Sequence, residues 1–564
     1  MAVFWSKITF FLCFCAFLTS LDAQSANEAL RHQIIQQVVH NRDDLAISYY
    51  RKHCSLNRPE YSLLRELGFA ILERDVKSSD AATQQLALFG ISMTADEHAI
   101  SFFQDALRSR DPALQLYALR QLCQYQEACA ESALKHAMSS PYILLRLEAA
   151  YLLATGRFPS ALSQVDALMQ KCPCEILPLF PIIISEITSD GAVHHMRKLL
   201  MNPSQDVRLS AVLSIAKKPN EVFIPYIRTL ASQNDSIQSE ACAYALGVMK
   251  DSLAVPLLIK LTHSHVMDTS LAACLALKEL GYKAYEQKIV DAALKGNPFA
   301  IHTLNEIDNT NEILLSLIQR GDSCIRANAA IAFIHSRDAR APQYMLEYLS
   351  PISPQPPLIR VMSNGKSLYA YKTAPLNLYD TPVWDTACEL SLQEREKWLV
   401  DCYACGEEPF LKLALQLIQR RQNDVIPTVF RLLQQSLSSE CDQFLEMCCR
   451  MPGYPLVRNY ALIALLKRGE KETCYAPLKE WVVSQWESDI LEFRPTISPW
   501  QAIDNDLIQS DLKPNETAKL FLDAIDVLIA EQDEATVDLI LEAIEKSHRK
   551  LHPIFAAILV RLVQ

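Results

Sequence analysis

A short pattern recurs along this chain at a period of about 31 residues, and such a period restricts the possible folds to a few. An apolar residue is followed by Arg or Gln, two variable residues and an Ala that leads an apolar stretch, as in Val207-Arg208-Leu209-Ser210-Ala211. A regular step of this length predicts a repeat array, in which each unit packs mainly against its neighbours. With the Ala position as anchor, successive anchors are 28 to 31 residues apart and fall at Ala87, Ala118, Ala149, Phe180, Ala211, Ala241, Ala272, Ala300 and Ala329.

Each period has room for two helices. Apolar stretches at 223–230 and 253–261 lie between anchors, and polar turn formers such as 201–204 and 321–323 separate the stretches. Caps and prolines at these places are typical of helix ends. One helix pair cannot bury both of its apolar faces, so the pairs must stack. The sequence therefore predicts an all-α fold, an α-solenoid of stacked helix pairs.

The pattern Val-Arg-x-x-Ala after a polar turn resembles the HEAT repeat of phycobilisome-lyase-like proteins. The resemblance covers about nine units over 76–350, with weaker copies around 410–417 and 457–465. It implies that the Arg three residues before the anchor makes ladder hydrogen bonds to neighbouring turns. The Arg occurs as Arg146, Arg208, Arg326 and Arg458, whereas Gln84, Gln115 and Gln238 replace it in other units.

The first 23 residues are typical of a signal peptide. Lys7 precedes an apolar run over 8–18 that is shorter than the roughly 20 residues of a membrane-spanning helix. Small and polar residues then lead to Ala23, after which cleavage is expected. An uncleaved anchor is the alternative. We therefore expect an exported protein, periplasmic or secreted, without a transmembrane segment after cleavage.

The remaining chain divides into five predicted regions. Four prolines interrupt the helical pattern after Ser350, and the sequence that follows alternates around Asn364-Gly365, which favours a β-hairpin and predicts strand only near 358–372. An extended Pro-rich loop is the alternative. The regions are an N-terminal helical cap (24–75), the HEAT-like array (76–350), the Pro-rich insertion with its β-hairpin (351–383), a second helical array (384–490) and a C-terminal helical cap (491–564).

Composition excludes several classes of function. The chain has only 12 glycines, none closer together than Gly281 and Gly296, so it cannot form the glycine-rich loops that bind nucleotides or present a nucleophile. A net charge of −11 without clusters of Lys and Arg argues against nucleic acid as a partner. The sequence contains no His-Glu step of the kind that binds iron in one HEAT-repeat enzyme family. We therefore expect neither a cofactor nor a metal.

Cys402 and Cys405 form the most suggestive local motif. A C-x-x-C pair can lower a thiol pKa or bind a metal, but no βαβ context and no second cysteine pair at suitable spacing accompanies it. We predict that the pair is a structural disulfide or two buried thiols. A thiol-exchange role is the alternative.

These observations predict a non-catalytic scaffold, exported from the cell, that binds another protein or an envelope component along a concave solenoid surface. A phycobilisome-lyase-like carrier or lyase of a small molecule is the alternative that the resemblance implies. The outward face of the anchor helices is the predicted binding surface, although every amphipathic helix has such a polar face. Its residues are Tyr117, Gln121, Gln124, Glu148, Ser210, Ser214, Lys217, Glu240, Tyr244, Asn328 and His335.

Overall fold

The computed structural model describes most of the chain and divides it into two compact units. The described residues are 28–54, 60–125, 128–233, 236–349, 358–363, 366–371, 392–488, 490–491, 493–496, 500–503, 511–530 and 534–564. Unit 1 comprises 1–106, 470–494 and 517–564, and unit 2 comprises 107–469 and 495–516. The predicted signal peptide lies outside the described residues. Within them, no helix is long and apolar enough to cross a membrane.

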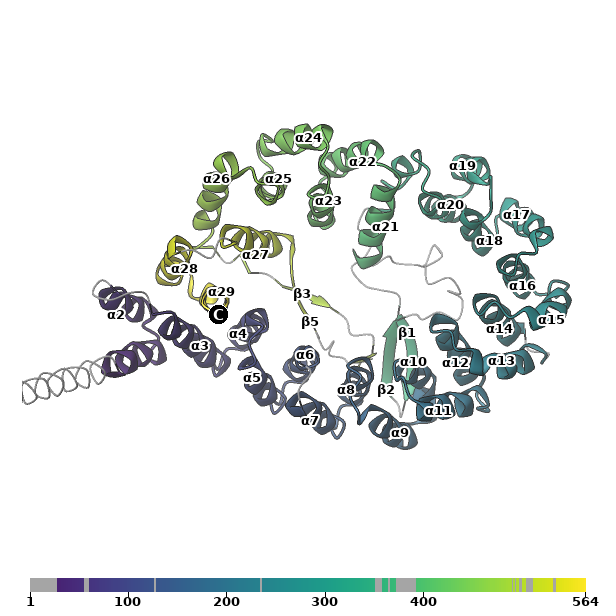
Figure 1. Ribbon diagram of the computed structural model, residues 1–564, viewed down its shortest axis with the longest axis horizontal. Helices are drawn as coiled ribbons and strands as arrows, with labels where there is room; N and C mark the ends of the chain where they lie inside the picture. The colour runs from purple at the N-terminus through teal and green to yellow at the C-terminus, as the bar shows by residue number, and fades with distance from the viewer. Residues whose placement is uncertain are drawn as a thin grey trace, which may run out of the picture. The chain divides into compact units, whose positions relative to one another are not determined.

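Unit 2 is built from two rows of helices that alternate along the chain (Figure 1). The anchor helices form an inner row in which neighbours stack, as α12 does on α14 and α14 on α16. The inner row consists of α6 (Pro112–Leu122), α8 (Ile143–Thr155), α10 (Phe180–Ser185), α12 (Gln205–Lys217), α14 (Ser236–Val248), α16 (Met267–Glu279), α18 (Pro298–Thr303), α20 (Ser323–His335), α21 (Leu392–Ala404), α23 (Ile426–Leu433) and α25 (Pro455–Lys467). The outer row consists of α7 (Ala128–Ala137), α9 (Ala161–Lys171), α11 (Asp190–Leu200), α13 (Ile224–Ala231), α15 (Val255–Leu261), α17 (Glu286–Leu294), α19 (Asn311–Arg320), α22 (Glu407–Gln419) and α24 (Ser439–Cys449).

Side-chain contacts follow the period of the sequence. Arg208 Nε donates to Gln238 Oε1 at 2.7 Å, 30 residues further along the chain. Arg120 Nε donates to Glu148 Oε1 at 2.7 Å, across 28 residues. Since such contacts join the inner helices of successive helix pairs, the predicted fold class, an α-solenoid of stacked HEAT-like pairs, is confirmed.

The ladder role implied by the resemblance is found at Arg208. Its Nη1 donates at 2.8 Å to the carbonyl of Asn202, six residues earlier. In a unit that has Gln at this position, Gln115 Nε2 donates to the carbonyl of Ser109, also six residues earlier. Gln84 Nε2 likewise donates to the carbonyl of Ser78, six residues earlier in the sequence. An amide can replace the guanidinium here because one N–H donor is enough to satisfy the carbonyl of the turn.

Small residues set the spacing of the inner row. A Cβ built on Gly247 of α14 would lie 2.6 Å from Ala276 Cα of α16. The anchor side chains Ala211, Ala241 and Ala272 are at most 1% exposed. Close helix contact at these places explains why the repeat retains Ala at its anchor.

The helix stack continues past the predicted insertion. Arg395 of α21 donates to the carbonyl of Leu349 at 3.1 Å and pairs with Asp424 at 2.5 Å. In addition, α21 packs on α20. The prediction that 351–383 divides two arrays is therefore wrong, because helices on both sides of it belong to one compact unit. Residues 350–357 and 372–391, which include most of the Pro-rich part, lie outside the described residues.

Strands occur within this region and also much later in the chain. β1 (Leu358–Ser363) and β2 (Lys366–Tyr371) pair antiparallel, with Leu358 opposite Tyr371. β4 (Trp500–Ile503) then pairs antiparallel with β2 in a three-stranded sheet. The expectation that strand is confined to 358–372 is thus wrong, because the sheet gains a strand that no hairpin signal marks. The other strands are β3 (Phe493–Thr496) and β5 (Asp511–Pro514).

Unit 1 is built from both ends of the chain. Its helices are residues 28–39, α2 (Asp43–Cys54), α3 (Tyr61–Val76), α4 (Ala81–Thr94), α5 (Ala99–Ala106), α26 (Lys471–Ser484), α27 (Glu516–Leu528), α28 (Glu534–Lys546) and α29 (His552–Leu562). α29 packs against α3 and α4, and α28 packs against α2. The prediction of two separate caps is wrong, since helices from the two ends of the chain pack against each other within one compact unit.

Glycines and an ion cluster join the two ends within unit 1. A Cβ built on Gly68 of α3 would lie 2.6 Å from Val560 Cγ2 of α29. His552 Nδ1 lies 2.7 Å from Asp43 Oδ2, and Arg74 Nη1 donates to Asp43 Oδ1 at 2.5 Å. Hydrogen bonds from these two partners keep the pKa of the buried Asp43 carboxyl below its usual range, against the effect of its desolvation.

Candidate binding surface

All but one of the residues predicted to bind a partner lie on helices of the inner row. They come from α6, α8, α12, α14 and α20, and Gln124 follows the end of α6. Their exposure differs from the prediction. Five of them are at most 7% exposed, namely Tyr117, Glu148, Ser214, Glu240 and Asn328.

Expecting these five side chains on an open face was therefore wrong. The helices that carry them, α6, α8, α12, α14 and α20, pack on neighbouring inner helices as well as on an outer helix. The solvated stripe is consequently narrower than that of an amphipathic helix on a globular core. Gln121, Ser210, Tyr244 and His335 are half-buried, and Gln124 and Lys217 are exposed.

Several residues of the predicted face make contacts within the fold. Ser210 Oγ donates to the carbonyl of Pro178 at 2.6 Å. Asn328 Nδ2 donates to the carbonyl of Cys324 at 2.9 Å, one turn back in α20. Glu148 pairs with Arg120. Their polar groups stabilise the stack, because a polar group that is buried must find a partner.

Glu240 on α14 has a carboxyl group with a strongly raised pKa. Desolvation raises the pKa of its carboxyl to about 7, and the nearby carboxylate of Asp268 on α16 adds to the increase. Carboxyl groups titrating near neutrality are common at functional sites, where burial is arranged to shift them.

A pair of histidines lies further along the same row. The rings of His302 on α18 and His335 on α20 are 5.6 Å apart. His335 Nε2 lies 3.5 Å from Asp401 Oδ2 on α21. Burial, and to a lesser extent His335, lower the pKa of His302 to about 4. His302 is thus neutral at physiological pH, and the pair contributes to packing between α18, α20 and α21.

Cys402 and Cys405 are buried free thiols, so the candidate disulfide is absent from this described part of the structure. Burial raises the pKa of Cys402 well above its usual range and that of Cys405 to about 11. Cys405 Sγ also donates to the carbonyl of Ile334 at 3.5 Å. Since the thiolate is the reactive species, both groups are unsuited to thiol exchange. In the part of the chain with assigned positions, no three His, Cys, Asp or Glu side chains are grouped to hold a metal ion.

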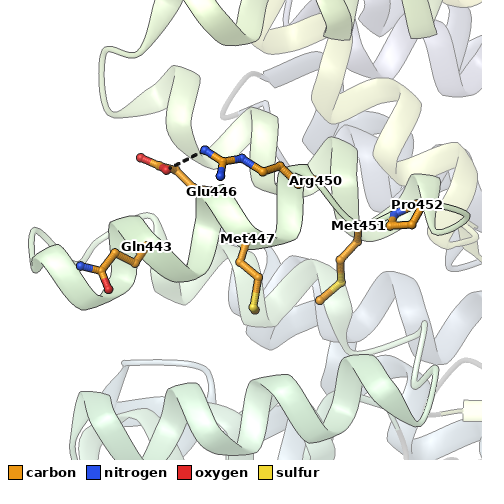
Figure 2. A pocket seen from close by; sticks show the side chains of 6 residues that line it. All are labelled: Gln443, Glu446, Met447, Arg450, Met451 and Pro452. Atoms are coloured by element: carbon orange, nitrogen blue, oxygen red, sulfur yellow. Dashed lines mark hydrogen bonds and ion pairs between the residues drawn. The ribbon is translucent and has the colours of Figure 1, made fainter.

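A surface pocket that sequence reasoning missed lies on α24, in the outer row (Figure 2). Its volume is about 540 Å³. Met447 and Met451 point in the same direction from α24 and the turn after it, while Arg450 pairs with Glu446 at 3.2 Å (Figure 2). Two methionines four residues apart were the available sequence signal. Gln443 and Pro452 complete the lining.

The strands of unit 2 contact part of its inner row. β4 contacts α8, β5 contacts α6, and β1 contacts the 3-10 helix η1 (Cys174–Leu179) that precedes α10. Segments of the chain itself therefore occupy part of the surface that was predicted to bind a partner.

Comparison with known proteins finds no matching protein family and no matching curated protein. Among solved structures, the chain is similar to the complex of CpcE and CpcF of phycocyanin lyase from Nostoc, at 19% identity and a TM-score of 0.25, covering 45% of this chain and 89% of that one. It is also similar to the Kap95:Nup1 complex, at 12% identity and a TM-score of 0.33, covering 94% and 72% of the two chains. A third similarity is to a homology model of the full-length AP-3 complex, at 11% identity and a TM-score of 0.30, covering 92% of this chain and 94% of that one.

Proposed function

We propose that this protein is an exported, non-catalytic scaffold that binds another protein or an envelope component along the inner row of unit 2. The observation that carries the proposal is the regular stack of α12, α14 and α16, which repeats one surface at each period. Solenoids use such extended surfaces for binding. Lys217 reaches solvent from α12, and the Tyr244 ring on α14 is half-exposed.

The chemistry of the reactive side chains supports a role without catalysis. The C-x-x-C thiols are buried and protonated at neutral pH. The carboxylate in the pocket on α24 is paired with Arg450 rather than placed beside a second acid or base. The alternative lyase or carrier function places a small molecule in the groove of the inner row, whereas the pocket of Figure 2 lies on the outer row.

Photo-cross-linking from the inner row tests the binding proposal. A photoreactive residue at Lys217 should give one dominant adduct in the native envelope fraction. Lys260 is also an exposed lysine, but it lies on the outer helix α15, and it serves as the control. Adducts at Lys260 but not at Lys217 would place the partner on the outer row and contradict the proposal.

Export is tested separately. Cell fractionation should recover the mature chain outside the cytoplasm, with an N-terminus at Gln24, if 1–23 is a cleaved signal peptide. Recovery of the full chain from the cytoplasm would overturn this part of the proposal and leave the binding surface to be judged by the cross-linking alone.

A further inference from the structure

Two glutamates occupy the same place in different repeats of the inner row. Glu148 on α8 and Glu240 on α14 each stand one residue before an anchor alanine, and they are 4% and 6% exposed. Glu148 accepts a hydrogen bond from Arg120 Nε at 2.7 Å. Arg120 stands two residues after the anchor of the preceding repeat, and the equivalent position before Glu240 is Leu213. Glu148 therefore has a guanidinium group beside it, whereas the equivalent position for Glu240 holds a leucine.

The Glu240 carboxyl consequently lacks a cation from its own fold. Within the described part of the chain, no hydrogen bond or ion pair reaches it. The charge that acts on it is another carboxylate, Asp268 of α16, which raises the pKa of Glu240 further. A buried carboxylate without a partner is costly, so a cation bound beside it would relieve an existing penalty.

An aromatic ring lies on the same side of α14. Tyr244 follows Glu240 by four residues, which places the two side chains on one face of the helix. Its ring is half-buried. An ammonium or guanidinium group next to a carboxylate can also rest on such a ring, and this contact adds to the attraction.

We propose that Glu240, Asp268 and Tyr244 form a site for a lysine or arginine side chain of a partner protein. The bound cation takes the place that Arg120 occupies beside Glu148. This inference rests on the proposed binding function and specifies the chemistry of the partner. The net charge of −11 is consistent with it, because an acidic chain attracts basic segments during encounter.

Binding of a short lysine peptide to the full chain tests the site directly. Calorimetry at low salt should detect binding of the peptide and no binding of the same peptide with acetylated side chains. Glu240→Gln should weaken binding about tenfold, the effect of losing one charge-assisted contact. Glu221→Gln removes the same charge from an exposed position just before the outer helix α13 and should leave the affinity unchanged. Equal weakening in both variants would show general charge attraction and overturn the proposal.

A second variant supplies the missing cation from within the chain. Leu213→Arg places a guanidinium at the position equivalent to Arg120, and it should abolish peptide binding by occupying the Glu240 site. Carbon-13 NMR of the Glu240 carboxyl provides a readout that needs no variant. The peptide should lower the pH at which this carboxyl titrates, and an unchanged titration at saturating peptide would also overturn the proposal.

The outcomes separate this inference from the proposed function. If a partner cross-links at Lys217 and the Glu240→Gln variant still captures it fully, the proposed scaffold function is supported and the proposed cation site is contradicted. If peptide binding depends on Glu240 but no cross-link forms at Lys217, the cation site is supported and the extended binding surface is contradicted.

Discussion

At the scale of single residues, burial has different consequences for equivalent side chains. Glu148 is neutralised by Arg120, whereas Glu240 has its pKa raised to about 7 by desolvation and by Asp268. The period in the sequence predicts that both lie on the inner helices. It does not predict their burial, because burial depends on how closely one inner helix approaches the next.

The raised pKa of Glu240 predicts a pH-dependent contribution to stability. In the unfolded chain the group titrates near 4.5, so between about pH 4.5 and 7 only the folded state retains its proton. The contribution is therefore complete below pH 4.5 and is lost as the pH rises through 7. Glu240→Gln should leave the free energy of unfolding nearly unchanged at pH 4 and increase it by about 1–3 kcal/mol at pH 8. Urea unfolding at the two pH values measures this, and an equal effect at both would contradict the raised pKa.

The cysteines differ in solvent exposure, and we expect their reactivity to differ accordingly. Cys174 is exposed, whereas Cys402 and Cys405 are buried with raised pKa values. Iodoacetamide at pH 8 should label Cys174 in the folded protein and should reach Cys402 and Cys405 only after denaturation. Peptide mass spectrometry resolves the sites. Labelling of Cys402 in the folded protein at the rate of Cys174 would show an accessible thiol and reopen the thiol-exchange alternative.

At the scale of elements, the sequence period accounts for most of unit 2. Anchor alanines, polar turns and prolines at helix starts are local signals, and each marks a helix or a helix end that the structure contains. The accessible face was predicted poorly, with Tyr117 and Asn328 buried. That error has a physical cause. An amphipathic pattern distinguishes core positions from the others, but it does not show whether the other positions face solvent or pack against the neighbouring repeat.

Close approach between α14 and α16 predicts unequal effects of two glycine substitutions. Gly247→Ala would bring a Cβ to 2.6 Å from Ala276 Cα, a backbone atom that cannot move alone. We expect a loss of about 1–3 kcal/mol despite the better helix propensity of Ala. In Gly191→Ala on α11 the close atom is Leu162 Cδ2, the end of a flexible side chain, so we expect little loss. Thermal unfolding of both variants compares them, and equal losses would mean that the backbones are not in close contact at Gly247.

At the scale of the molecule, the association of the two chain ends in unit 1 was not predictable from the repeat. A helical period reports contacts between neighbouring units, but α29 and α3 are separated by most of the sequence. A local trace of the association is glycine at Gly68 and Gly90, where α29 approaches too closely for a side chain. The same limitation applies to β4, which pairs with β2 from far along the chain.

Unit 1 should therefore lose structure at both ends of the sequence together. Phe555 of α29 is 1% exposed and contacts the rings of Trp486 and Phe521. Phe555→Ala should cost about 3–5 kcal/mol through the cavity that it leaves. Since α29 packs on α3 and α4, hydrogen exchange should accelerate over 61–94 as well as over 534–562.

Phe333→Ala is the matched control for this experiment, because Phe333 on α20 of unit 2 is equally buried. It should accelerate exchange around 323–335 and leave 61–94 protected. If Phe555→Ala accelerates exchange in the C-terminal helices alone, the N-terminal helices keep their structure without α29, and the two ends do not form one cooperative unit. If hydrogen exchange over 61–94 accelerates in Phe555→Ala but not in Phe333→Ala, the first and last helices must fold against each other. Neither end of the chain then forms an independent cap.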